Sequence, residues 1–203
     1  MSYKMKGNHK PILRRRREGK TNYARRKTLI RGDIPFIAPR ISNKNISAQI
    51  IKAQLNGDLT ISSAFSKELI QYGWKGSRDN TSAAYLTGFI LGLKSVIKGV
   101  NKVVLYIGNR KYIQGTRIPA IIKGTIDAGL EVSVDTETLP EEKRLKGEHI
   151  AEFAKNMADK NPENRKKRFS AIILAGLTPE EYSTHFEEIK NNISEKLKVN
   201  NKK

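Results

Sequence analysis

The stretch NISAQIIKAQLNGDLTISSAF, residues 45–65, consists of two apolar segments on either side of a turn. The first segment alternates in part, and one parity holds Ile46, Ala48 and Ile50. The second, Leu59–Phe65, is another strand pattern. Between them lies Asn56-Gly57-Asp58, and Asn and Gly tolerate the positive φ that hairpin turns require. The stretch therefore predicts an antiparallel β-hairpin.

A third extended segment precedes this hairpin. Ile34–Ile41 contains Pro35 and Pro39, and proline has no N–H to donate to a neighbouring strand. We therefore expect this strand at an edge of the sheet. Ser42-Asn43-Lys44 has turn chemistry and connects it to the hairpin. Together the three segments predict an antiparallel meander.

The sequence after the hairpin changes to a helical period. Asn80 or Thr81 can cap a helix that runs to about Lys98. Small residues recur at four-residue intervals along one side of this helix, at Ala84, Gly88 and Gly92. Such a ridge allows close packing, and we expect it to face the sheet.

Two further strands and a helix complete the central region. Lys102–Ile107 and Glu131–Val134 are strand patterns, and Arg117–Ala128 is a helix that Gly129 can terminate in a left-handed conformation. The last three strands can then be parallel neighbours joined by right-handed crossovers. The predicted fold class of residues 32–135 is α/β with a mixed sheet.

Residues 136–203 are expected to form a C-terminal helical region. Pro140-Glu141-Glu142 is a helix start whose acids lie near the positive end of the dipole, and a stripe of Ile150, Phe153, Ala154 and Met157 follows it. A second helix covers about Glu163–Ala175 and ends at Gly176. A third begins at Thr178-Pro179 and runs to about Ile193. The polar tail, Lys198–Lys203, is expected to fray.

The first 31 residues form a basic arm. They contain twelve Lys and Arg and a single acid, Glu18, so they carry +11 of the net charge of +19. Like charges repel, and few apolar side chains are present to offset the chain entropy lost on folding. We expect the arm to become ordered only on a polyanion. Nucleic acid is the first choice and an anionic membrane surface the second.

The arm has the side chains that RNA recognition uses. Arginine presents a planar fork to phosphate groups, lysine is a point charge, and tyrosine can stack on unpaired bases. The candidate RNA-binding residues are Arg14, Arg15, Arg16, Arg17, Lys20, Tyr23, Arg25, Arg26, Lys27 and Arg31, together with Tyr3. Further cations in the rest of the chain could extend the footprint: Arg40, Lys44, Lys52, Lys75 and Arg78. From the basic run alone, a solvated tail or a localisation signal stays open.

Signatures of catalysis are missing from the sequence. There is no cysteine, which excludes disulfides and thiolate chemistry and suits a reducing cytosol. His9, His149 and His185 lie far apart without metal-ligand spacing. Gly108 and Gly115 flank the basic loop Asn109–Tyr112, but a glycine pair without a helix-start pattern is weak evidence for a nucleotide site. We expect no metal and no cofactor.

A metal-dependent nuclease is the alternative, because the order of elements is similar to that of nuclease folds. Two-metal chemistry needs clustered carboxylates. The strands expected at 34–41, 45–55 and 102–107 contain no Asp or Glu, and Asp58, Asp127 and Asp135 fall in a turn, a helix and a strand end. The sequence therefore disfavours this reading.

Membrane insertion and export are also disfavoured. The basic start lacks the apolar stretch of a secretory signal, and residues 14–20 offer no apolar face for a transit peptide. The most apolar window, Ala83–Ile97, is interrupted by Thr87, Lys94 and Ser95 and is too short to span a bilayer. We expect a soluble, cytoplasmic protein.

Several strings of the chain resemble a known family. They are RRRREGKTNYARRKTLI (14–30), the hairpin at 56–58, KELIQYGWKGS (67–77) before NTSAAYLTG (80–88), and KGTIDAGL (123–130). In the same order, over about residues 1–190, they resemble large-subunit ribosomal protein eighteen of the universal nomenclature. The similarity is to the archaeal and eukaryotic branch, which binds 5S ribosomal RNA.

This resemblance implies a structural constituent of the large ribosomal subunit and not an enzyme. It implies a core similar in topology to ribonuclease H but without the active site, a basic arm on 5S rRNA, and a place in the central protuberance. Large-subunit rRNA and neighbouring ribosomal proteins would be further partners. The residues that match the family's RNA-contacting segment are Arg14–Arg17, Lys20, Thr21, Tyr23, Arg25 and Arg26. Arg78-Asp79 departs from the small neutral residues expected there, which puts that loop's RNA contact in doubt.

Overall fold

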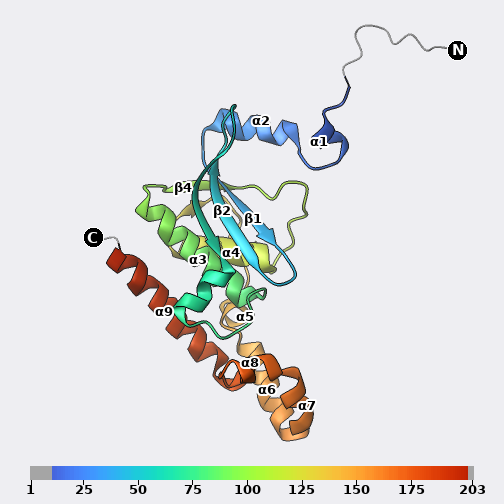
Figure 1. Ribbon diagram of the computed structural model, residues 1–203, viewed down its shortest axis with the longest axis vertical. Helices are drawn as coiled ribbons and strands as arrows, with labels where there is room; N and C mark the ends of the chain where they lie inside the picture. The colour runs from blue at the N-terminus through green and yellow to red at the C-terminus, as the bar shows by residue number, and fades with distance from the viewer. Residues whose placement is uncertain (1–10, 201–203) are drawn as a thin grey trace, which may run out of the picture.

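The computed structural model describes residues 11–200, with side chains as far as Leu197. The expectations for Tyr3, His9 and the end of the tail fall outside these residues. A five-stranded mixed sheet with the order β3-β2-β1-β4-β5 forms the centre (Figure 1). Its strands are β1 (Phe36–Ile41), β2 (Ile46–Lys52), β3 (Leu59–Phe65), β4 (Lys102–Leu105) and β5 (Glu131–Val132). The α/β fold class is thus confirmed.

The antiparallel meander is present as expected. β2 pairs with β1 on one side and with β3 on the other. The predicted parity of Ile46, Ala48 and Ile50 is fully buried. The hairpin loop spans residues 53–58 and is longer than a two-residue turn, with Gly57 at a φ of 137°. This parity therefore fixes which face of the sheet forms the main core.

The expected edge position of β1 is wrong, because β1 is the central strand. Phe36 and Ile37 are both buried, on opposite faces, as a central strand requires. The carbonyls of Pro35 and Ile37 accept hydrogen bonds from Val104 and Tyr106, at the β4 side. Pro39 has the same parity as these residues. Its missing N–H therefore faces a side where β4 has already ended, so the proline costs no sheet hydrogen bond.

The parallel part of the sheet also differs from expectation. β4 pairs in parallel with β1, and β5 pairs in parallel with β4. The third meander strand, β3, was expected in this group, but it forms the far edge beside β2. Its residues Leu59, Ser63 and Phe65 are exposed, which suits an edge with one open face. The central strand β1, apolar on both faces, takes the interior place instead.

Two helices cover one face of the sheet, α3 (Thr81–Ile97) and α4 (Arg117–Asp127) (Figure 1). Asn80 caps α3, since its Oδ1 accepts a hydrogen bond from the N–H of Ala83 at 2.8 Å. The ridge of small residues faces α4 and not the sheet, contrary to expectation. A Cβ on Gly88 would overlap the Ile121 carbonyl, and one on Gly124 would overlap the Tyr85 carbonyl. The two helix backbones thus touch directly.

The C-terminal region is helical, but the first two expected helices are each divided into shorter ones. The elements of this region are α5 (Glu142–Lys146), α6 (Glu148–Lys160), α7 (Pro162–Arg168), α8 (Ser170–Leu174), a 3₁₀ turn at Pro179–Glu181, and α9 (Tyr182–Asn200). Gly147, at a φ of 77°, separates α5 from α6. Phe169 separates α7 from α8 and is buried. The last helix runs to Asn200 and not to about Ile193.

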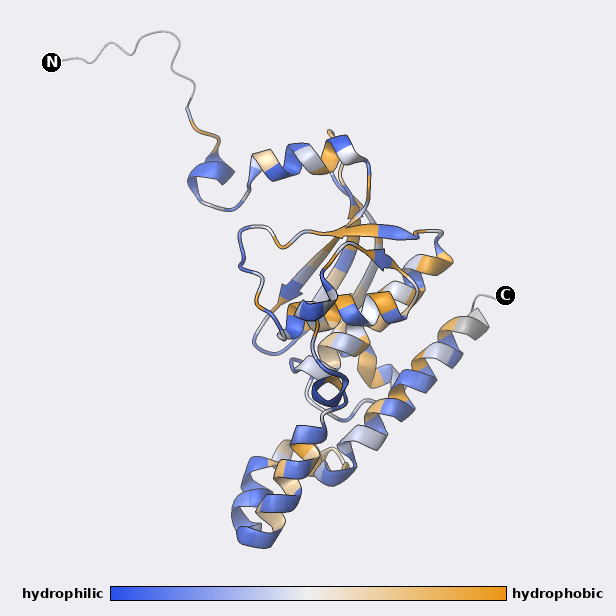
Figure 2. Cartoon of the chain, turned by 180° about the vertical axis from the view of Figure 1, so that it is seen from behind, coloured by the Kyte–Doolittle hydropathy of each residue, from blue (hydrophilic) through white to orange (hydrophobic). Residues whose placement is uncertain are grey.

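The C-terminal helices share a core with the α/β part. Tyr182, Phe186, Ile189 and Ile193 of α9 are buried in the same apolar cluster as the sheet and α3. The Nδ2 of Asn80 also donates a hydrogen bond to the Tyr182 hydroxyl at 2.6 Å. Figure 2 shows the apolar sheet and α3 at the centre and mostly hydrophilic helices α6 and α7 at one end. Within residues 11–200, no helix is sufficiently long and apolar to cross a membrane.

Candidate nucleic-acid interface

The described part of the basic arm contains two helices, α1 (Arg14–Arg17) and α2 (Tyr23–Gly32). The N-cap of α2 is Asn22, whose Oδ1 accepts a hydrogen bond from the Arg25 N–H at 3.1 Å. Leu29 and Ile30 pack against a small apolar cluster of Phe36, Ile51 and Ala53, on the sheet face opposite α3. Helix α2 is therefore packed on the sheet. It does not fold alone, because the sheet supplies its apolar partners.

An ion pair fixes α2 to the hairpin loop. The guanidinium of Arg26 donates to both carboxylate oxygens of Asp58, at 2.7 and 2.9 Å, and also to the Gln54 carbonyl at 3.3 Å. The Arg26 guanidinium lowers the pKa of Asp58 by hydrogen bonding. A bidentate pair of this kind is directional as well as strong. Arg26 thus holds the arm in place, whereas the sequence suggested only a contact to RNA.

The loop after β4 contacts the arm as well. The Arg25 guanidinium donates to the Gly108 carbonyl at 3.1 Å, and the Asn109 amide donates to the Gly19 carbonyl. These contacts join segments more than eighty residues apart in the sequence. The basic loop Asn109–Tyr112 therefore lies beside the arm.

Several cations of α1 face solvent. Arg14 and Lys20 both contact Glu18, at 2.9 and 2.8 Å, and their hydrogen bonds lower the pKa of Glu18, with Lys20 the larger cause. The Arg15 guanidinium donates to the Thr21 hydroxyl at 2.8 Å. Arg16 and Arg17 are exposed and, within the described residues, have no carboxylate within 4 Å. Their charge is available to a phosphate backbone.

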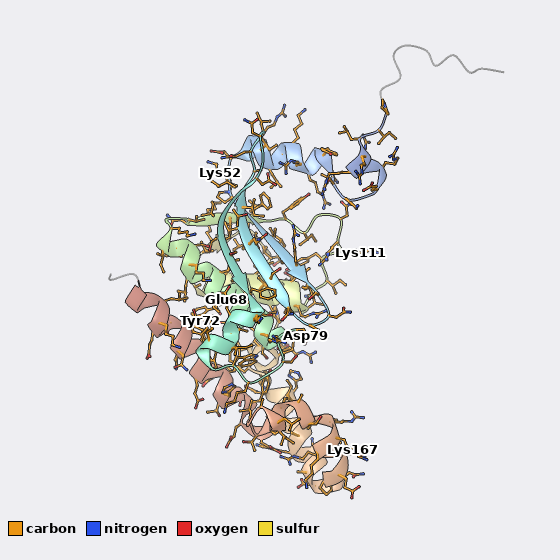
Figure 3. All side chains as sticks on the ribbon, in the orientation of Figure 1. Lys52, Glu68, Tyr72, Asp79, Lys111 and Lys167 are labelled. Carbon is orange, nitrogen blue, oxygen red and sulfur yellow. The ribbon has the colours of Figure 1, made fainter. Side chains whose placement is uncertain are left out.

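The other candidates are spread over the molecule. Lys27 and Arg31 are exposed on α2, and Tyr23 is half-buried. Lys52 pairs with Asp33 at 3.1 Å, close to the arm. Lys44 lies in the turn at the opposite end of β1, and Lys75 donates to the Gly176 carbonyl at 3.1 Å near the C-terminal helices. Figure 3 shows Lys52 near the arm and Asp79, the neighbour of half-buried Arg78, beyond the opposite end of the sheet. The structure thus separates these cations into two groups.

A groove lies between the arm and the open face of the sheet, with a volume of about 450 Å³. Its rim carries Arg15, Lys20, Arg26, Arg40 and Arg110, and the carboxylate that lines it, Asp58, is paired with Arg26. Arg40 and Arg110 are exposed and have no carboxylate within 4 Å in the described part of the chain. The cations that the structure gathers here come from α1, the segment between α1 and α2, α2, β1 and the loop after β4, so they form one positive surface.

Arg110 and Lys111 were missed as candidates. They line a second hollow, together with Asn22, Arg25 and Tyr112, of about 670 Å³. Figure 3 shows Lys111 on the loop at the arm side of the sheet. The signal available in the sequence was the basic loop between Gly108 and Gly115, but its place beside the arm depends on tertiary structure.

The carboxylates considered for a nuclease have other partners. Asp58 pairs with Arg26, and Asp127 accepts a hydrogen bond from the Tyr85 hydroxyl at 2.6 Å. Asp135 accepts one from the Glu137 N–H at 3.2 Å. Among residues 11–200, no three His, Cys, Asp or Glu side chains are grouped as a metal site would require.

Comparison with known proteins gives a consistent family. A family model described as "Ribosomal large subunit proteins 60S L5, and 50S L18" matches residues 8–101. Proteins named "Large ribosomal subunit protein uL18" are similar over most of the chain. The one from Caldivirga maquilingensis is 44% identical over 94% of this chain and 92% of its own length. The one from Aeropyrum pernix is 46% identical over 92% and 87%, and the one from Methanosphaera stadtmanae is 43% identical over 92% and 95%. The chain therefore belongs to the uL18 family of large ribosomal subunit proteins.

Proposed function

We propose that this protein binds 5S rRNA through its arm and helps to anchor that RNA in the central protuberance of the large ribosomal subunit. Family membership makes it a structural protein of the large subunit of the cytoplasmic ribosome. The finer assignment rests on one observation, namely the positive surface formed by the arm, Arg40 and Arg110 around a single groove. The proposed role is structural and not enzymatic.

The physical basis is neutralisation of phosphate charge. Each neutralised phosphate releases condensed counterions, so the logarithm of the affinity falls with the logarithm of the salt concentration by about 0.7–0.9 per contact. Phosphate contacts from the arm would fix its position on the RNA, and the folded part would recognise RNA shape. Neighbouring large-subunit proteins and large-subunit rRNA would be further partners.

Replacing Arg14–Arg17 with alanine tests this role. We expect lower affinity for a 5S rRNA transcript and a salt slope smaller by up to about 3, since up to four phosphate contacts are lost. The matched control replaces four exposed lysines of α6 and α7 with alanine: Lys155, Lys160, Lys166 and Lys167. It removes the same charge at the other end of the molecule. An equal drop in slope for both variants would mean that net charge, and not the arm, drives binding.

Specificity and catalysis need separate measurements. Transfer RNA in excess should not displace the 5S transcript if the folded part recognises RNA shape.

The nuclease alternative predicts cleavage of labelled RNA in Mg²⁺ or Mn²⁺ that disappears when Asp58, Asp127 and Asp135 are all replaced with asparagine. We expect intact RNA with the unaltered protein.

A further inference from the structure

We propose that the groove between the arm and the sheet is a binding site for a single unstacked nucleotide, whose base lies on the ring of Tyr106. The inference rests on the proposed function and assigns one site within the RNA-binding surface. It depends on the floor of the groove, which differs from its rim.

The floor of the groove is apolar and aromatic. We use this name for the lining residues Phe36, Ala38, Ile51 and Tyr106; Leu29, Pro39 and Ile107 are further apolar residues of the lining. Phe36 and Ile51 are buried, whereas Tyr106 and Ala38 are half-buried and accessible from the groove. A patch of cations for a phosphate backbone alone has no need of such a floor. A nucleobase has two apolar faces and stacks on aromatic side chains.

The ring of Tyr106 is held in a fixed orientation. It meets the ring of Phe36 edge-on, with centroids 5.3 Å apart and an interplanar angle of 75°. Backbone pairing also fixes its position, because the Tyr106 N–H donates to the Ile37 carbonyl at 2.9 Å. A ring that is already oriented loses little side-chain entropy when a base stacks on it.

The rim matches the remainder of a nucleotide. Arg40 and Arg110 lie on the same groove as Tyr106 and are unpaired within the described residues. Arg15 and Lys20 close the groove from the arm. Its volume of about 450 Å³ lies within the range of small-molecule sites. The apolar floor suits one base, and the cationic rim suits the phosphates on either side of it. A continuous duplex cannot present a base face to the floor, since its bases are stacked.

Substitution of Tyr106 tests the site. We expect Tyr106→Leu to weaken binding of the 5S transcript about tenfold, as loss of one base–aromatic stack does, without a change in the salt slope. Tyr106→Phe keeps the ring and should bind as the unaltered protein does. The control is Tyr72→Leu, which removes another half-buried tyrosine whose ring lies under the Lys196 ammonium, 5.3 Å away. Tyr72→Leu should not change the affinity.

A second measurement needs no substitution. A transcript containing 4-thiouridine is irradiated in complex with the unaltered protein, and crosslinked peptides are identified by mass spectrometry. We expect a crosslink to the segment that carries Tyr106, in addition to those on the arm. This result stands even if Tyr106→Leu fails to fold, which circular dichroism would reveal.

The outcomes separate the two proposals. If Tyr106→Leu binds normally and crosslinks form only on the arm, the nucleotide site is wrong, while the slope change of the Arg14–Arg17 variant still supports the proposed function. If that slope also stays unchanged, the proposed function fails as well. An equal loss for Tyr106→Phe and Tyr106→Leu would show that the hydroxyl, and not stacking, matters, and would overturn the site as described.

Discussion

The contact between α3 and α4 and the contact between the arm and the sheet are built in opposite ways. In the first, glycines allow two helix backbones to touch, and the surrounding side chains, such as Ala84, Leu86 and Ile122, are fully buried. In the second, Leu29 and Ile30 are only half-buried, and the ion pair between Arg26 and Asp58 is about a third exposed. The first contact excludes water, and the second is in part solvated.

This difference indicates where stability and function reside. Close packing of buried groups contributes most to the free energy of unfolding, whereas partly exposed contacts can open locally without unfolding of the core. The positive surface proposed to bind RNA lies on the second kind of contact. Three predictions test this division, from the largest effect to the smallest, and a fourth with a still smaller effect concerns His185.

Gly88→Ala should destabilise the whole protein by about 3 kcal/mol, because the new methyl group overlaps the Ile121 carbonyl and forces α3 away from α4. Chemical denaturation followed by circular dichroism measures this change. The control is Gly32→Ala at the end of α2, where no atom beyond the chain neighbours and the helix's own backbone lies within 4 Å of the new Cβ. It should change the free energy of unfolding by less than about 1 kcal/mol. Equal effects would remove the distinction between the two contacts.

Asn80→Ala should cost about 2 kcal/mol of global stability, since it removes both the α3 cap and the hydrogen bond to Tyr182. Asn22→Ala removes the same kind of cap from α2. We expect it to leave the global free energy of unfolding nearly unchanged and to speed amide hydrogen exchange within α2 only. A global loss from Asn22→Ala would show that the arm folds as one unit with the core.

Asp58→Ala should release α2 at a cost of about 1 kcal/mol, a value reduced by solvent screening. Faster hydrogen exchange over residues 23–32 is the readout, and exchange in α3 should not change. The pKa of Asp58 lies below its usual 3.8, so the native state binds fewer protons than the unfolded state below that pH. The contribution of the pair is therefore complete above about pH 4 and is lost as the pH falls further. A variant without the carboxylate should lack this acid dependence.

The smallest effect is expected at His185. Its Nε2 accepts a hydrogen bond from the Lys75 N–H at 3.1 Å, and its ring stacks on Trp74. Burial lowers its pKa, and the Lys75 ammonium lowers it further, whereas Glu188 opposes the shift. The unfolded state therefore binds more protons just below pH 6.5, so stability falls as the pH decreases through that window. His185→Gln should flatten this part of the pH profile, and an unchanged profile would assign it to His149.

Local patterns were sufficient for much of the fold. The parity of Ile46, Ala48 and Ile50, the cap at Asn80 and the bounds of α4 all follow from short-range chemistry. The edge position predicted from Pro39 is wrong, because a proline shows that an N–H donor is missing but not which side of the strand that donor would face. The ridge of small residues at Gly88 predicts close packing, but it does not show which element packs against it. Gly147 interrupts a helix whose apolar stripe continues beyond it, so the sequence alone suggested one helix.

The candidate site shows the same limit. The charge pattern of the sequence located the arm. The ion pair between Arg26 and Asp58 could not be predicted in this way, because the two residues lie 32 positions apart in the sequence. Arg110 reaches the groove, and Lys111 reaches the second hollow, only because the loop after β4 returns to the arm. Tyr106 lies within the strand pattern predicted at Lys102–Ile107, and the open sheet face beside it is revealed only by the strand order.

The packing of α2 on the sheet has a thermodynamic consequence. A segment that folds on binding buries its own apolar surface at that moment, which gives a large negative heat-capacity change and a large unfavourable entropy. In this protein Leu29 and Ile30 already lie against the sheet. Calorimetry of the RNA complex should therefore show the modest heat-capacity change of two preformed surfaces meeting.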